Sequence, residues 1–198
     1  MKRWIAVILA VMLVCALAAC GNKKPNNTNN NNNNNNNSSS SSVVPTTAPK
    51  PTESPDKEVV FGDMKITLPK EFVDNKALIP SDSDIKCYYT NTQEELAFAA
   101  LNEDKSDFAK TKVQSLDDYL EVQHTNSKGS VTSEIKEDNG LKYFDYEAEG
   151  TNGTIYKYFS TAFESDDYYW FVQFYTTKEQ YSKYESKFLE WSHTVTKA

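Results

Sequence analysis

Apolar and polar positions divide the chain into three zones. Residues 4–19 carry no charged side chain and follow the positive pair Lys2 and Arg3. Residues 22–58 contain few apolar side chains. From residue 59 onward, apolar and polar residues alternate with the periods of strands and helices. The pattern therefore predicts an apolar leader (residues 1–19), a spacer (residues 20–58) and one folded domain (residues 59–198).

The first half of the folded zone predicts short strands followed by a helix. The expected strands are 59–61, 64–68, 86–90 and 95–101, and the last of these also fits a helix. Ser115 is suited to cap the N-terminus of a helix over residues 116–125. Asp117 and Asp118 would lie in its first turn, where the helix dipole favours anions.

The second half predicts a meander of four strands closed by a helix. The expected strands are 131–137, 141–149, 154–164 and 168–176, and Asn139-Gly140 suits the first tight turn. Residues 168–175 are bulky on both faces, which is typical of a central strand covered on both sides. Thr177 and Gln180 form a capping-box pattern ahead of the last helix. That helix has an apolar stripe made of Tyr181, Tyr184, Phe188, Trp191 and Val195.

These elements together predict the fold class α+β, an antiparallel meander sheet sandwiched by helices. A domain of about 140 residues can bury a substantial core.

The leader ends in Leu17-Ala18-Ala19-Cys20. Its sixteen uncharged residues fall short of the roughly 20 that a membrane-spanning helix needs, so the pattern indicates a signal peptide. The four final residues match the bacterial lipobox, and the N-terminus resembles a lipoprotein signal. That resemblance implies cleavage before Cys20 and acylation of its sulfur, with palmitate among the attached chains. The alternative is an ordinary secretory signal cut near Ala19.

The spacer is of low complexity. Residues 29–37 are all asparagine, residues 38–42 are all serine, and four prolines follow before residue 56. Such a composition cannot offset the entropy cost of ordering, so it predicts a disordered linker of about 35 Å root-mean-square span. The alternative is an asparagine tract that aggregates or binds a ligand.

The order of the folded zone resembles the Mog1/PsbP-like family, which includes bacterial lipoproteins. The resemblance depends on three short pieces and the long meander between them: Ile66-Thr67-Leu68-Pro69-Lys70-Glu71-Phe72, then Leu116-Asp117-Asp118-Tyr119, and finally Tyr181, Tyr184, Phe188 and Trp191-Ser192. It implies a module for binding or assembly, as members of that family serve a small GTPase or photosystem components. The family has no shared catalytic motif, so the resemblance transfers no functional residue.

Charge excludes one class of partner. Residues 59–198 contain 15 lysines and 25 acidic residues, a net charge of −10, and no arginine follows Arg3. Binding of nucleic acid requires a basic patch, often with arginine, so we expect no nucleic-acid partner.

Few residues suggest catalysis. Cys87 is the one cysteine of the folded zone and lies in a strand pattern, which favours a buried, inert thiol over a reactive one. His124 and His193 fall near the ends of the two predicted helices, where the dipole favours a cation. The acid pairs Asp82/Asp84 and Asp166/Asp167 resemble calcium ligands, but the first lacks the rest of an EF-hand loop and the second suits a turn.

Tyrosines are the last candidates. The pairs Tyr88/Tyr89, Tyr143/Tyr146, Tyr156/Tyr158 and Tyr168/Tyr169 either fill the sheet core or form an exposed binding face, and the core is the preferred interpretation.

We therefore expect a non-catalytic binding or assembly module, anchored by the lipid on Cys20 to the extracytoplasmic face of the cell membrane. An envelope protein is its expected partner, and no cofactor or metal is expected. The alternatives are a cell-envelope hydrolase or carbohydrate-handling enzyme that uses surface carboxylates, and a passive spacer or surface-coat component.

Overall fold

The computed structural model describes residues 56–81, 83–127 and 132–198. The predicted signal peptide, Cys20 and nearly all of the predicted linker lie outside these residues. The first strand, β1 (Lys57–Phe61), begins two residues ahead of the predicted domain boundary. None of the helices in the described part of the chain has the length and apolar character needed to cross a membrane.

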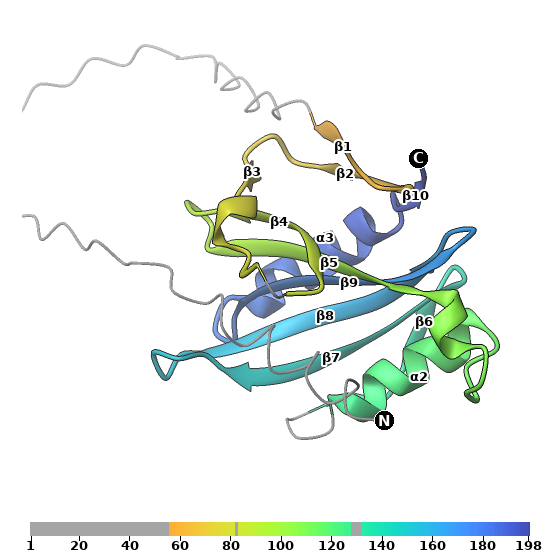
Figure 1. The fold of residues 1–198 in the computed structure, drawn as a ribbon. Coiled ribbons are helices and arrows are strands. Elements are labelled where there is room, and N and C mark those ends of the chain that lie inside the picture. Colours follow the sequence, from red (N-terminus) through yellow and green to blue (C-terminus); the bar gives the residue numbers. More distant parts are fainter. Residues whose placement is uncertain (1–55, 82, 128–131) are drawn as a thin grey trace, which may run out of the picture. The chain divides into compact units, whose positions relative to one another are not determined.

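A seven-stranded antiparallel sheet forms the centre of the fold (Figure 1). Its strand order is β3-β4-β5-β9-β8-β7-β6. The strands are β3 (Val73–Asp74), β4 (Ile85–Asn91), β5 (Leu96–Asp104), β6 (Lys136–Asp138), β7 (Leu141–Glu149), β8 (Ile155–Glu164) and β9 (Tyr168–Thr177). The predicted meander is present as β7, β8 and β9, and β9 lies between β5 and β8 with eight of its ten residues buried. The prediction of a central, doubly covered strand is therefore confirmed.

Two details of the meander differ from the prediction. Within the described part of the expected strand 131–137, the chain forms β6 and, ahead of it, a single bridge from Thr132 to Tyr146. Between them, Ser133 exchanges hydrogen bonds with Asp145 through its backbone amide and its hydroxyl. The predicted strand 95–101, which also fitted a helix, is present as strand β5, which begins one residue later and continues to Asp104. The Asn139-Gly140 turn is as expected, since both residues have positive φ values, 47° and 84°.

A second, three-stranded sheet has the order β1-β2-β10, with β2 at Met64–Leu68 and β10 at Thr196–Lys197. The residues of β2 alternate between buried and half-buried, as expected for a strand with one face on a core. The sequence pattern predicted one sheet, whereas the chain forms two. The small sheet consists of the β1–β2 hairpin, to which the C-terminal residues add a third strand by pairing with β2.

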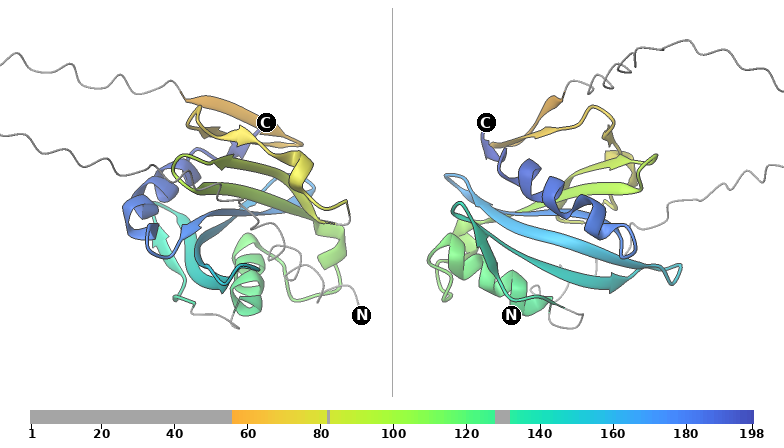
Figure 2. Two further views of the ribbon diagram at one scale, coloured as in Figure 1. Left: turned by 90° about the vertical axis from the view of Figure 1, so that its left-hand side faces the viewer. Right: turned by 180° about the vertical axis from the view of Figure 1, so that it is seen from behind.

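The helices cover opposite faces of the large sheet. Helix α2 (Leu116–Asn126) packs on β7, β8 and β9 from one side, and α3 (Tyr181–Ser192) packs on β8, β9 and β2 from the other. Figure 2 shows the small sheet on the same side as α3. The α+β class with helices on both faces of an antiparallel sheet is therefore confirmed.

One of the two predicted helix caps is correct. Ser115 Oγ accepts a hydrogen bond from the backbone amide of Asp118 at 3.1 Å, as a capping residue should. At the start of α3, Gln180 forms no side-chain cap bond, so the predicted capping box is wrong. The Gln180 amide instead donates to Glu95 Oε2 at 2.6 Å, in the turn between β4 and β5. The Gln180 side chain thus bonds to a residue distant in sequence and not to the start of its own helix.

Two hydrophobic cores follow from this layering, one on each face of the large sheet. The core under α2 is rich in tyrosine, whereas the core under α3 and the small sheet is rich in phenylalanine, with Trp170 and Trp191.

Candidate functional site

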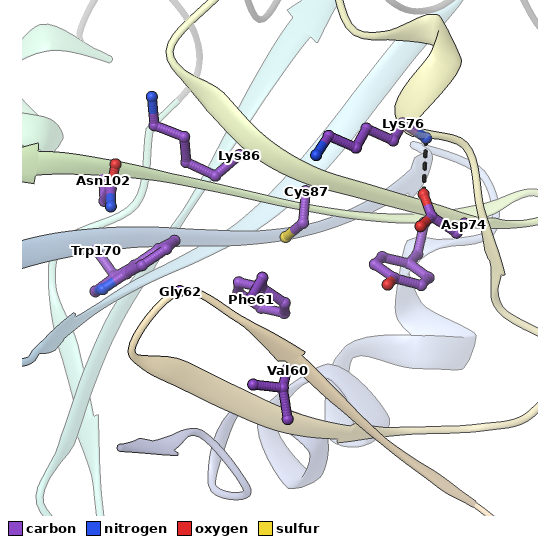
Figure 3. Close-up of a pocket in the computed structure, with 10 residues that line it drawn as sticks. Val60, Phe61, Gly62, Asp74, Lys76, Lys86, Cys87, Asn102 and Trp170 are labelled. Carbon is purple, nitrogen blue, oxygen red and sulfur yellow. Dashed lines mark hydrogen bonds between the residues drawn. The ribbon is translucent and has the colours of Figure 1, made fainter. Parts of the chain in front are cut away.

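A cleft of about 400 Å³ lies where the β1–β2 hairpin approaches β4 (Figure 3). Its residues come from five separate segments of the chain. They are Val60, Phe61, Gly62, Asp74, Lys76, Lys86, Cys87, Tyr89, Asn102 and Trp170. The cleft is therefore a product of the tertiary fold, bordered by both sheets.

Aromatic side chains form the inner wall of the cleft. The rings of Phe61 and Trp170 meet edge to face, with centroids 5.6 Å apart. Trp170 is 1% exposed, and its Nε1 donates to Asp63 Oδ1 at 3.0 Å. Gly62 has a φ of +62°, and a Cβ added there would lie 3.3 Å from the indole ring. A glycine at this turn thus allows the hairpin to approach the tryptophan closely.

A β-bulge in β4 places Lys86 at the cleft. Ile85 pairs with Leu101 and Cys87 with Ala100, so Lys86 is the extra residue on this strand. Without the bulge, Ile85 and Cys87 would lie on the same face. With it, Ile85 packs in the core under α2 while Cys87 packs in the core on the opposite face. Bulges recur beside functional sites because they redirect side chains in this way.

Charged groups gather at the mouth of the cleft. The carboxylate of Asp74 accepts a hydrogen bond from the backbone amide of Lys76 at 2.8 Å, the bond drawn in Figure 3. Among the described residues, the ammonium groups of Lys76 and Lys86 form no ion pair and no hydrogen bond. A third lysine, Lys57, lies with its Nζ 5.4 Å from the centre of the Tyr89 ring. The lining residues therefore include two lysines and one carboxylate, a small excess of positive charge.

The thiol in the cleft is protonated. Burial raises the pKa of Cys87 far above its ordinary value, and the nearby charge of Asp74 raises it further, against a lowering by the backbone of Ala100. The side chain is 5% exposed. The prediction of a buried thiol is therefore confirmed, and its burial disfavours the thiolate that a reactive cysteine needs. Burial, followed by the charge of Asp74, also raises the pKa of Tyr89.

The two histidines lie at the predicted helix ends and on opposite sides of the large sheet. His124 is in the last turn of α2, and its Nε2 is 2.8 Å from the carbonyl oxygen of Ser133. His193 is the C-cap residue of α3, with its Nε2 2.9 Å from Asp138 Oδ2 beside a smaller pocket of about 230 Å³. The fold thus does not bring them together as a catalytic pair.

The two acid pairs are the remaining candidates for an ion site. Asp82 lies outside the described residues, and Asp166 forms an ion pair with Lys197 at the surface. Within residues 56–81, 83–127 and 132–198, no group of three or more His, Cys, Asp or Glu side chains has an arrangement that could hold a metal ion.

Most of the tyrosine pairs have at least one member in the core under α2. Tyr146 and Tyr158 stack at 4.6 Å with ring planes 6° apart, and Tyr158 contacts Tyr175 at the same centroid distance. The hydroxyls of Tyr88 and Tyr175 are 3.0 Å apart. The preferred interpretation, a tyrosine-rich sheet core, is therefore confirmed for these residues. Tyr89 differs, since it is half-buried and lines the cleft.

Sequence reasoning singled out two of the ten cleft residues, Cys87 and Tyr89, and neither as part of a pocket. Lys76 falls between the predicted strands 64–68 and 86–90, where no element was expected, and it lies in the short 3₁₀ turn η1 (Lys76–Leu78). To place Lys86 at the cleft from the sequence, one would have had to predict the β-bulge in β4. The one local signal is Gly62, a glycine between two short strand patterns.

No protein-family model matches the chain, and a search of curated proteins found no match. Several solved structures are similar to it at low identity. The solution structure of cyanobacterial PsbP (CyanoP) from Synechocystis sp. PCC 6803 is 10% identical, with a TM-score of 0.49, over 78% of this chain and 100% of that one. The Ran-binding protein Mog1p of Saccharomyces cerevisiae is 11% identical, with a TM-score of 0.44, over 72% of this chain and 95% of that one.

A third similar structure is a protein of unknown function, PA94 from Pseudomonas aeruginosa, described as a putative regulator. It is 11% identical, with a TM-score of 0.38, over 68% of this chain and 92% of that one. PsbP and Mog1 are the two proteins to which the sequence resemblance points. The likeness concerns the fold alone.

Proposed function

We propose that this chain is a lipid-anchored, extracytoplasmic module that binds another component of the cell envelope through the cleft between β1 and β4. The cleft is the observation on which this proposal depends. It combines an open mouth, an aromatic wall and two lysines without a partner among the described residues. Such a mixture of apolar surface and a few polar groups is typical of binding sites.

The composition of the cleft favours binding over hydrolysis. A glycoside hydrolase needs two carboxyl groups about 5–9.5 Å apart. Asp74 is the one carboxylate among the ten lining residues, and it is already bonded to a backbone amide. Nucleophilic catalysis by Cys87 would need a thiolate, which burial disfavours. These features support a non-catalytic role.

The anchor is supported by the sequence. Cys20 ends the lipobox, and 36 residues separate it from Lys57, where β1 begins. A flexible chain of this length spans about 35 Å root-mean-square. The strand that borders the cleft is therefore the first element after the spacer, which would hold the cleft within reach of components near the membrane surface.

Lipid attachment is tested by labelling cells with radioactive palmitate. We expect the label to enter the wild-type protein and to be absent from the Cys20→Ala variant, which should leave the detergent phase. Equal labelling and equal partitioning of both forms would refute the anchor.

Binding is tested by site-specific photo-crosslinking in intact cells. A photoreactive amino acid at Asn102, a half-buried cleft residue, is compared with the same amino acid at Thr151, which is exposed in the turn between β7 and β8. We expect a reproducible adduct from position 102 only. An adduct pattern no different from position 151 and from an unrelated lipoprotein would refute binding through the cleft.

A further inference from the structure

The cleft carries positive charge within an acidic domain, and this contrast indicates the chemistry of its partner. Residues 59–198 have a net charge of −10, whereas the cleft residues include two lysines and one aspartate. The aspartate is bonded to a backbone amide, and both ammonium groups are without an ion pair among the described residues. A complementary partner brings negative charge to this point.

Exposed aliphatic side chains occur on the chain segments that form the site. The large hydrophobic residues exposed in the described part of the chain are Val60 at 57%, Val73 at 60% and Leu78 at 54%. Val60 lines the cleft, Val73 precedes Asp74, and Leu78 follows Lys76 by two positions. Clustering of exposed apolar residues at one place is a mark of an interaction surface.

The kind of apolar surface distinguishes between two classes of anionic partner. Binding of a sugar usually needs an exposed aromatic face, and Trp170 is 1% exposed. Phe61 and Tyr89 are half-buried, and the large apolar side chains that are exposed are instead valines and a leucine, which suit contact with the side chains of a polypeptide.

Two strand edges border the cleft. Among the described residues, β1 pairs with β2 alone, and β3 pairs with β4 only at Tyr89 and Thr90. On this side, β4 has no strand partner beyond Tyr89, but η1 packs against it, so β1 offers the freer edge. Figure 3 shows the hairpin that contains Phe61 and Gly62 facing the strand that carries Lys86 and Cys87. An extended segment can bind along such edges through its main chain.

We propose that the cleft binds an acidic, extended polypeptide segment of an envelope partner, an inference that depends on the proposed binding function. Carboxylates of the segment contact Lys76 and Lys86. An apolar side chain of the segment contacts Val60, the exposed aliphatic residue that lines the cleft. The charge selects the partner, and the apolar contact adds affinity.

The test measures the binding of three rhodamine-labelled heptapeptides to the lipidated, full mature chain in nanodiscs by fluorescence anisotropy. All three have blocked ends and a central leucine, flanked by glutamates, by lysines or by serines. The variant Lys76→Gln/Lys86→Gln is compared with Lys110→Gln/Lys112→Gln, which removes two exposed lysines from the loop ahead of α2. Thermal unfolding establishes that both variants are folded.

We expect the acidic peptide to bind more tightly than the other two, and its affinity to fall about tenfold in the cleft variant but less than about twofold in the loop variant. Raising the ionic strength from about 0.05 to 0.5 M should weaken binding as well. Equal affinity for the three peptides, or equal losses in the two variants, would overturn the proposal.

Two further outcomes separate this inference from the proposed function. If the acidic peptide does not bind but the Asn102 adduct forms in cells, the partner is not an acidic segment and the cleft remains a binding site. If an oligogalacturonate binds in place of the peptide, the partner is an anionic carbohydrate and the inference is wrong. Loss of both the adduct and the peptide binding refutes the proposed function itself.

Discussion

A buried carboxylate holds α3 to the edge of the large sheet, and its removal should destabilise the fold strongly. Asp145 on β7 is 3% exposed. Its side chain accepts hydrogen bonds from Lys136 Nζ at 2.7 Å and from the hydroxyl of Tyr181, the first residue of α3. One carboxylate thus links β6, β7 and α3. Burial and the adjacent Asp145 raise the pKa of Tyr181 far above its ordinary value, so this hydroxyl remains a donor.

The loss of stability in Asp145→Ala can be estimated from the two donor groups that lose their acceptor. Removing one partner of a buried ion pair costs about 3–5 kcal/mol when the other charge stays buried. The Lys136 side chain is 42% exposed and can be solvated, which reduces that cost. The buried Tyr181 hydroxyl cannot be solvated, and leaving a buried polar group without a hydrogen bond costs about 1–3 kcal/mol. We therefore expect the free energy of unfolding to fall by about 2–4 kcal/mol.

The assay is guanidinium unfolding followed by tryptophan fluorescence, with Asp167→Ala as an exposed control. Tyr181→Phe should cost about 1 kcal/mol, because Asp145 keeps its lysine partner. The double variant should show a coupling energy of about 1–2 kcal/mol, since the two residues share one hydrogen bond. A loss for Asp145→Ala within about 0.5 kcal/mol of the control, or additive single losses, would refute this reasoning.

Three further predictions test other parts of the account. Burial, and secondarily Asp84 and Asp107, raise the pKa of Glu103 above 4.5 despite two hydrogen bonds from α2. The stability contributed by this raised pKa is present at low pH and is lost as the pH rises through the pKa of Glu103 in the folded state. Glu103→Gln should therefore reduce the fall in unfolding free energy above pH 4.5, and an unchanged dependence of that free energy on pH would contradict this. Gly62→Ala should cost about 1–2 kcal/mol in denaturant unfolding, because alanine is strained at φ +62° and its Cβ would press on the indole, and an unchanged midpoint would show that the hairpin shifts freely. Cys87 should react with a thiol reagent at least about a hundredfold faster in denaturant than in the native chain, and fast native labelling would show that the cleft opens to expose it.

The sequence was most informative where structure is local. Strands β7, β8 and β9 follow one another through tight turns, so alternation and turn residues such as Asn139-Gly140 were enough to predict them. Ser115 capped its helix as expected because that bond spans three residues. Tyr168–Thr177 was recognised as the central strand because bulky residues occupy both of its faces.

Long-range pairing set the limit of these predictions. Strand β10 consists of two residues that pair with Met64 and Lys65, about 130 positions earlier. The alternation of apolar and polar residues does not predict such a long-range pairing. Gln180 fitted a local cap, but its bond to Glu95 depends on how α3 meets the β4–β5 turn. The cleft joins Gly62, Lys86 and Trp170, which come together only after both sheets have formed. Candidate sites of this kind have no sequence motif.

Photo-crosslinking from Asn102 in intact cells is the measurement that tests the central claim most directly. The account predicts one reproducible adduct that requires Cys20 and is absent when the photoreactive group is at Thr151. An Asn102 adduct that persists at equal yield in the Cys20→Ala variant would contradict the role of the anchor. No adduct above the Thr151 background would contradict the cleft as a binding site.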